Sequence, residues 1–270
     1  MSIRGLIIPK EHGAWAVLLV PMIVVSCVVE TFSLNLLLLA GSTLAMFMSS
    51  GPVQMILRNR LAGSLESEKL RDAKFLAGLC LLASLILATP LLLQGLWLLT
   101  AFGFLAAVSF FLSFFISKGT HKSIRSDLLA VFGLTLSAPS TYYLLQGTID
   151  SLSLELWLLN FLFFGSSVFY VHMKITATKF RGSELNASQK LLLGKMNLVY
   201  HVVVLAIITT LVALNYTEEL AIGAFAPIVI HSIYGTVKLS TKVSFKRLGF
   251  LLLGQSIVFG ILVTLTLRVS

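Results

Sequence analysis

Residues 75–116, FLAGLCLLASLILATPLLLQGLWLLTAFGFLAAVSFFLSFFI, decide the fold of this chain. The stretch contains no Asp, Glu, Lys or Arg, and Gln94-Gly95 divides it into two apolar runs, 75–93 and 96–116. A helix needs about 20 mostly apolar residues to cross a bilayer. The two runs therefore predict a pair of membrane-spanning helices joined by a tight turn.

The rest of the chain has the same character. Of its 270 residues, 57% are hydrophobic and 11% are charged, whereas about 25% are charged in an ordinary soluble domain. Lipid solvates so much apolar surface when every backbone polar group is paired within helices. We expect an all-α polytopic bundle, one integral membrane domain over residues 1–270. Its nine expected transmembrane helices are 13–29, 34–56, 75–93, 96–116, 127–146, 155–175, 196–214, 219–237 and 248–267.

The basic residues support this count of helices. Of the 20 Lys and Arg residues, all except Arg268 fall in the N-terminal tail or around the gaps after the second, fourth, sixth and eighth helices. Cytoplasmic loops accumulate Lys and Arg, so the pattern predicts a cytoplasmic N-terminus. The net charge of +9 then reflects membrane topology, and no basic domain points to nucleic acid as a partner.

Polar groups gather at the expected cytoplasmic ends of the helices, beginning at Lys10, Glu11 and His12. Ionisable residues that border a membrane span are candidates for function. Consecutive helical residues point about 100° apart, so at least one of the three should turn into the bundle. A charged collar at the start of a helix explains the cluster about equally well.

The second expected helix carries Ser50, Gln54 and Arg58 at a spacing of four, which places them on one face. Such a stripe should face protein or a water-filled cavity. Hydrogen bonding between helices explains it as well as ligand contact does.

The sixth expected helix ends in Tyr170, His172 and Lys174, of which Tyr170 and Lys174 share a face. A lysine so near the interface can simply snorkel to the headgroups. Further polar side chains follow on the seventh and eighth expected helices. They are Asn197, Tyr200, His201, His231 and Tyr234.

The fifth expected helix begins near Arg125-Ser126-Asp127. Ser126 suits an N-cap and Asp127 suits the first turn, so structural capping is the favoured interpretation. Pro139, deep in the same helix, should kink it.

No metal site is predicted, because no pair of His, Glu or Asp residues has ligand spacing on a helix. Cys27 and Cys80 lie inside apolar segments and suit small core residues. No cofactor can be named from the sequence.

The stretch Pro9-Lys10-Glu11-His12-Gly13-Ala14-Trp15-Ala16, continuing to Pro21, resembles the YwiC-like family of bacterial membrane proteins. Length and hydropathy match over nearly the whole chain. The resemblance implies a multi-pass protein of the bacterial inner membrane.

A more distant resemblance is to the UbiA-type intramembrane prenyltransferases, in the nine helices and in the inner loops after the second and sixth. Those enzymes hold magnesium and an isoprenyl diphosphate with aspartate-rich motifs after these helices. The corresponding stretches here, 50–60 and 172–179, contain no aspartate. If the fold is shared, the metal-diphosphate clamp is absent or rebuilt around basic residues.

The leading hypothesis is a cytoplasm-facing polar cavity that binds a lipidic or isoprenoid anion. Lys10, Arg58 and Lys174, with His172, would contact the anion, and Gln54 would orient it. Glu11 or His12 would be the proton-transfer group, if the protein is an enzyme.

A small-solute transporter is the main alternative. Transporters place their sites near the bilayer midplane, and here the midplane is largely apolar. A non-catalytic assembly partner of another membrane complex is a third hypothesis.

Overall fold

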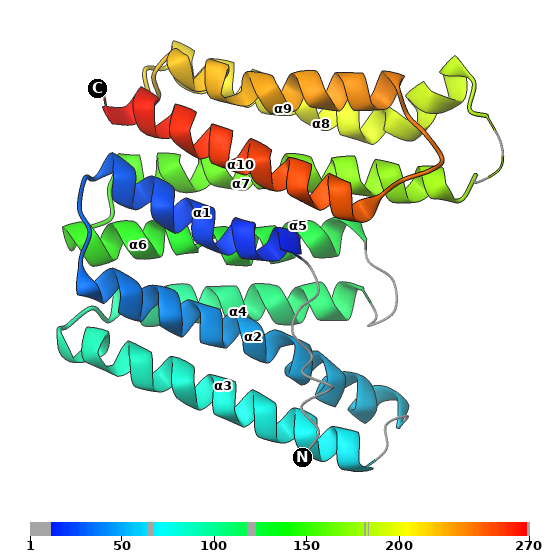
Figure 1. Ribbon diagram of the computed structural model, residues 1–270. Helices are drawn as coiled ribbons and strands as arrows, with labels where there is room; N and C mark the ends of the chain where they lie inside the picture. Colours follow the sequence, from blue (N-terminus) through cyan, green and yellow to red (C-terminus); the bar gives the residue numbers. More distant parts are fainter. Residues whose placement is uncertain (1–11, 64–66, 118–122, 181, 183, 269–270) are drawn as a thin grey trace. The chain divides into compact units, whose positions relative to one another are not determined.

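The computed structural model describes residues 12–63, 67–117, 123–180, 182 and 184–268. Every regular element in these ranges is a helix, as expected (Figure 1). The helices are α1 (His12–Val28), α2 (Leu34–Ala62), α3 (Ser67–Leu93), α4 (Leu98–Ile116), α5 (Ile124–Thr135), α6 (Ser137–Gln146), α7 (Ser151–Thr178), α8 (Ala187–Ala213), α9 (Leu220–Val237) and α10 (Phe245–Arg268).

The nine expected segments are confirmed as helical. In the part of the chain that the structure describes, eight segments are long and apolar enough to cross a membrane, with α5 and α6 together forming one of them. A shorter apolar helix, Gly13–Val28, is the ninth. The cytoplasmic position of the N-terminus stays a prediction.

Several helices extend beyond their apolar runs. Helix α2 continues past residue 56 to Ala62, α3 begins at Ser67 instead of residue 75, and α8 begins at Ala187 instead of residue 196. Lys, Arg, Glu and Gln are strong helix formers, so a helix continues where its sequence turns polar. Hydropathy marks the part that lies in hydrocarbon and misses these polar turns.

The chain forms two compact units. Unit 1 comprises Met1–Leu19 and Thr31–Thr148, and unit 2 comprises Val20–Glu30 and Ile149–Ser270. Each is described by itself below, and the expectation of one domain stays a prediction.

Unit 1 is built around the α2–α3 hairpin. Ser42 Oγ of α2 donates a hydrogen bond to the carbonyl oxygen of Ser84 on α3 at 2.9 Å. Asn35 Nδ2 donates to Gln94 Oε1 at 2.7 Å about two turns further from the α2–α3 loop, where α2 begins and α3 ends. The turn into α4 passes through Gly95 at φ 84°, a left-handed conformation that favours glycine. The expected tight turn at Gln94-Gly95 is thus confirmed.

The fifth expected helix is interrupted just before Pro139. Helix α5 ends at Thr135 and α6 begins at Ser137. Proline has no N–H for the carbonyl four residues earlier, which here belongs to Thr135. Ser137 Oγ donates to the Leu18 carbonyl oxygen of α1 at 2.9 Å. The kink is confirmed, and a buried hydroxyl ties it to a neighbouring helix.

The start of α5 needs a correction. Ser123, not Ser126, is the N-cap, and its side chain accepts from the Ser126 backbone N–H at 3.1 Å. Ser126 returns the contact to the Ser123 N–H as the third residue of a capping box. The apolar run starts about one turn after the helix begins. Hydropathy therefore predicts the helix start too late in the sequence. Asp127 lies in the first turn, as expected.

Unit 2 contains α7, α8, α9 and α10 around an aromatic core. Phe163 of α7 stacks on Phe259 of α10 with ring centroids 4.0 Å apart. Phe225 of α9 meets both rings edge-on. All three side chains are at most 3% exposed. These rings pack α7, α9 and α10 into one bundle.

The outer surfaces of the helices are apolar. Helix α3 has the highest mean hydropathy of the spans, 2.4, yet only 11% of that window is buried inside the protein. Its exposed side chains include Leu82, Ile86 and Leu93. Soluble proteins rarely leave large contiguous apolar surfaces in water. The chain is therefore an integral, multi-pass membrane protein, and its apolar helices fit a lipid bilayer.

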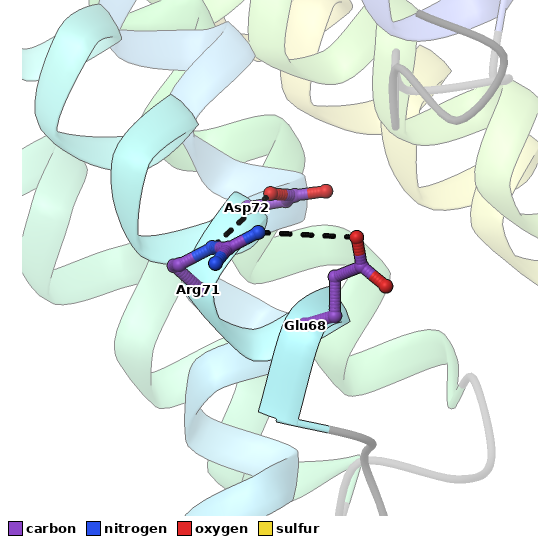
Figure 2. A network of polar contacts seen from close by, with 3 residues as sticks. All are labelled: Glu68, Arg71 and Asp72. Atoms are coloured by element: carbon purple, nitrogen blue, oxygen red, sulfur yellow. Dashed lines mark ion pairs between the residues drawn. The ribbon is translucent and has the colours of Figure 1, made fainter. Parts of the chain in front are cut away.

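The N-terminal end of α3 carries an exposed ion-pair group, shown in Figure 2. Arg71 lies 3.8 Å from Glu68 and 4.0 Å from Asp72, and all three side chains are more than 70% exposed. Water and salt screen such pairs, so each contributes little. We expect Arg71→Ala to change the free energy of unfolding by less than about 0.5 kcal/mol in a denaturant titration of the detergent-solubilised protein. A loss above about 1 kcal/mol would show that Arg71 has another partner.

Candidate functional site

A buried polar cluster lies where α7, α8 and α9 meet in unit 2. It consists of Met173, Asn197, His201, Ser232 and Thr236. Asn197 is its centre, since Nδ2 donates to Ser232 Oγ at 2.7 Å and to Thr236 Oγ1 at 3.2 Å. Asn197, Ser232 and Thr236 are at most 1% exposed. Polar groups so deep in a membrane bundle stay buried because they bond one another.

The orientation of the Asn197 amide follows from the bonds around it. Thr236 Oγ1 has two acceptors for its single proton, the Ser232 carbonyl oxygen at 2.9 Å and the Met173 sulfur at 3.3 Å. It can therefore only accept from Asn197, which requires the amide nitrogen at that contact. Both Nδ2 protons are thereby used, and Asn197 Oδ1 has no hydrogen-bond donor among the residues that the structure describes.

His201, one helical turn after Asn197 on α8, completes the cluster. Its Nδ1 lies 2.7 Å from the Asn197 carbonyl oxygen and 3.1 Å from Ser232 Oγ. The side chain is 97% buried, and its Nε2 has no hydrogen-bond partner among the described protein atoms. Asn197 Oδ1 and His201 Nε2 are thus two buried polar atoms without a hydrogen-bond partner in the part of the chain that the structure describes.

Lys174 lies beside this cluster, at the end of α7. Its Nζ donates to the Gly235 carbonyl oxygen of α9 at 3.1 Å and lies 5.1 Å from the centre of the Tyr170 ring. The shared face of Tyr170 and Lys174 is thus confirmed. The His231 ring lies 4.7 Å from the same tyrosine ring. Across the described ranges Lys174 forms no ion pair with a carboxylate. A half-buried ammonium group without a counter-ion can hold an anion.

Two glycines allow these helices to approach closely. A Cβ at Gly194 of α8 would overlap the Thr236 side chain, and a Cβ at Gly235 of α9 would overlap the Tyr170 ring. Small residues at helix contacts let backbones come together in membranes. The absence of two side chains therefore permits both the polar cluster and the Lys174 contact.

The predicted site residues are distributed over both units. Lys10 and Glu11 lie outside the described residues, and His12 begins α1. On α2, Gln54 is half-buried and Arg58 is exposed. On α7, His172 is half-buried, and a spacing of two residues places it on the opposite face from Lys174. Their roles stay predictions.

Ser232, Gly235 and Thr236 were missed by the sequence analysis. The signal was present, because Ser232 and Thr236 are hydroxyl residues four apart on an apolar helix, with Gly235 on the same side. Asn197 and His201 were noticed as polar residues, but their partners on another helix could not be known.

No metal centre is found in the described ranges, where no three His, Cys, Asp or Glu side chains come together. Cys27 and Cys80 are free thiols and half-buried. Asn197 Oδ1 and His201 Nε2 alone are too few for a structural metal site, which takes four protein ligands.

Comparison with known proteins gives one match. The family model described as YwiC-like protein matches residues 8–142, half of the chain, which include the Pro9–Pro21 motif. No curated protein and no solved structure matches. Together with the helical membrane fold, the match confirms the resemblance seen in the motif, and the chain belongs to the YwiC-like family.

Proposed function

We propose that this YwiC-like protein resides in the bacterial inner membrane and binds a lipidic or isoprenoid anion at the Lys174 end of α7. The observation that carries the proposal is the Lys174 ammonium group itself. It is half-buried, it is bonded to a backbone carbonyl, and in the described part of the chain it has no carboxylate partner.

The contacts of Lys174 favour binding over simple snorkelling. A snorkelling lysine extends towards the headgroups, whereas Lys174 reaches across to Gly235 of α9 and stacks over Tyr170. An ammonium group has three N–H donors, and the Gly235 carbonyl takes one. Two N–H donors are then available for the oxygens of a ligand, and an anion would offset the cost of burying the ammonium charge.

The position of Lys174 indicates the kind of anion. The residue lies one turn before the end of α7. This helix contains a stretch of 18 residues that is apolar enough to span the membrane. Lys174 therefore belongs to the layer where lipid headgroups lie. An amphiphile with an apolar tail and a phosphate or diphosphate head suits such a position, because its tail can stay in the bilayer.

Thermal unfolding of the detergent-purified full-length protein tests the proposal. The probes are phosphatidylglycerol and farnesyl diphosphate, each with and without magnesium, and phosphatidylcholine is the uncharged control. A ligand at one hundred times its dissociation constant stabilises the folded state by about 2.7 kcal/mol. We expect an anionic probe to raise the apparent melting temperature of the wild type and Lys174→Gln to lose that rise.

Lys179→Gln is the matched control, because Lys179 ends the same helix but is exposed. It should keep the full ligand-induced rise. An equal rise in Lys174→Gln and the wild type would contradict the proposal. A rise that requires magnesium and farnesyl diphosphate would support prenyltransferase-type binding, and a rise with phosphatidylglycerol alone would support a lipid ligand.

The same measurement applies to the groups proposed from the sequence. Lys10 and Arg58 are proposed to contact anionic oxygen, Gln54 to orient the ligand, and Glu11 or His12 to transfer a proton. His12→Ala and Arg58→Ala should each reduce the ligand-induced rise while the protein stays folded. Unchanged rises in both variants would remove these residues from the proposal.

A further inference from the structure

The polar cluster holds a histidine whose protonation pattern is fixed by its neighbours. His201 Nδ1 and the Asn197 carbonyl oxygen are 2.7 Å apart. Two lone pairs repel at that distance, so a proton must lie between the two atoms, and the carbonyl has none to give. Nδ1 therefore carries the proton, and in a neutral imidazole the other nitrogen, Nε2, is then a bare acceptor.

The alternative, in which the Ser232 hydroxyl donates to Nδ1, fails on the same contact. The Ser232 Oγ to Nδ1 distance is 3.1 Å, longer than the 2.7 Å to the carbonyl. If Ser232 were the donor, the short contact would set two acceptors against each other. Ser232 Oγ accepts from Asn197 Nδ2, and because a hydroxyl oxygen has two lone pairs it can accept from Nδ1–H as well.

Two bare acceptors thus lie on one face of α8. His201 Nε2 and Asn197 Oδ1 belong to side chains four residues apart, whose Cβ atoms are separated by about 5–6 Å on a helix. Both atoms are buried and have no donor within the described ranges, and the side chains are 3% and 1% exposed. Leaving a buried acceptor without a donor is costly, so a molecule that donates to both atoms would stabilise the folded protein.

We propose that His201 Nε2 and Asn197 Oδ1 together bind one small molecule bearing O–H or N–H donors, a water molecule or an ammonium ion, in the interior of unit 2. A molecule with two donors satisfies both atoms at once, as buried waters commonly do. The site goes beyond the proposed anion binding, since its two atoms accept hydrogen bonds, whereas Lys174 donates them. Failure of one proposal therefore leaves the other intact.

Nuclear magnetic resonance of the full chain, labelled with ¹⁵N-histidine in detergent micelles, tests the proposal. In buffer free of ammonium we expect His201 to show a protonated Nδ1 and a non-protonated, hydrogen-bonded Nε2. We also expect magnetisation exchange between its ring protons and a bound water. His201→Phe identifies the His201 signals, because they disappear in that variant. If His201→Phe does not fold, substituting the other four histidines one at a time identifies the His201 signals as those that persist in all four variants.

Asn197→Ala separates the two parts of the argument. The variant keeps the backbone carbonyl, so the Nδ1–H form should persist, while loss of Oδ1 should weaken the exchange with water. If ammonium chloride, but not sodium chloride, shifts the wild-type His201 signals, the bound donor is ammonium. A protonated Nε2 in a neutral ring, or a bare Nε2 that responds to neither water nor ammonium, would overturn the proposal.

Discussion

Phe259→Ala should destabilise the protein by about 3–5 kcal/mol, as truncation of a fully buried aromatic side chain does. Phe259 is 1% exposed, stacks on Phe163 at 4.0 Å and meets Phe225 at 5.3 Å. Truncation would remove packing contacts with two helices and leave a cavity that the rigid neighbouring rings cannot fill. Unfolding of the solubilised protein by a denaturing detergent measures the change.

Phe250→Ala is the control on the same helix. Phe250 is 65% exposed and in the membrane meets lipid, whose tails can follow a smaller side chain. We expect a change of less than about 1 kcal/mol there, as for a substitution outside the packed core. Equal losses in the two variants would mean that α10 is not packed against α7 and α9 through these rings.

Gly194→Ala should be the next most harmful substitution. The added methyl group would overlap the Thr236 side chain, which cannot move away because it accepts from Asn197 and donates to the Ser232 carbonyl. Forcing atoms into a packed interior costs roughly 1–3 kcal/mol, and occasionally more. We expect the unfolding midpoint to fall, together with the His201 to water exchange, since α8 and α9 would separate.

Gly223→Ala is the matched control, because no heavy atom lies within 4 Å of a Cβ built there. Alanine is favoured over glycine in a helix interior by about 1 kcal/mol, so this variant should be as stable as the wild type or more so. Destabilisation of similar size at both positions would show that glycine matters for something other than close helix contact.

Much of the fold could be predicted from apolar run length and the placement of charge. The structure contains the two helices predicted at 75–93 and 96–116 and the turn between them. They could be predicted because each depends on the properties of neighbouring residues. The kink before Pro139 is also local, since it follows from one missing N–H. The sequence favours Ser126 as the N-cap of α5, whereas the structure has Ser123 in that position. The two differ because hydropathy does not reveal where a helix begins outside the hydrocarbon.

The candidate site was less predictable, because its contacts join helices distant in sequence. Asn197 meets residues of the next helix, Ser232 and Thr236, and Lys174 meets the carbonyl of Gly235. Neither contact follows from a fixed spacing in the sequence, because its partners belong to different helices. Close approach at Gly194 and Gly235 decides which faces meet, and apolar helices carry many glycines without such a role.

The family match and the polar cluster concern different parts of the chain. Residues 8–142 match the family model, whereas the contacts of Lys174, Asn197 and His201 all lie beyond them. The site proposed in unit 2 therefore rests on its own geometry, and the variants of unit 2 test it without reference to the family.

The unequal lengths of the helices bear on how the protein fits bilayers of different thickness. At 1.5 Å per residue, α2, with 29 residues, is about 43 Å long, and α7, with 28, is about 42 Å. Both exceed a hydrocarbon core of about 30 Å, so they reach headgroups even when tilted. Helix α9, with 18 residues, is only about 27 Å long. Lipids with long acyl chains would therefore strain the two short helices, α9 and the 17-residue α1, and in α9 the strain would reach the carbonyl of Gly235 that holds Lys174.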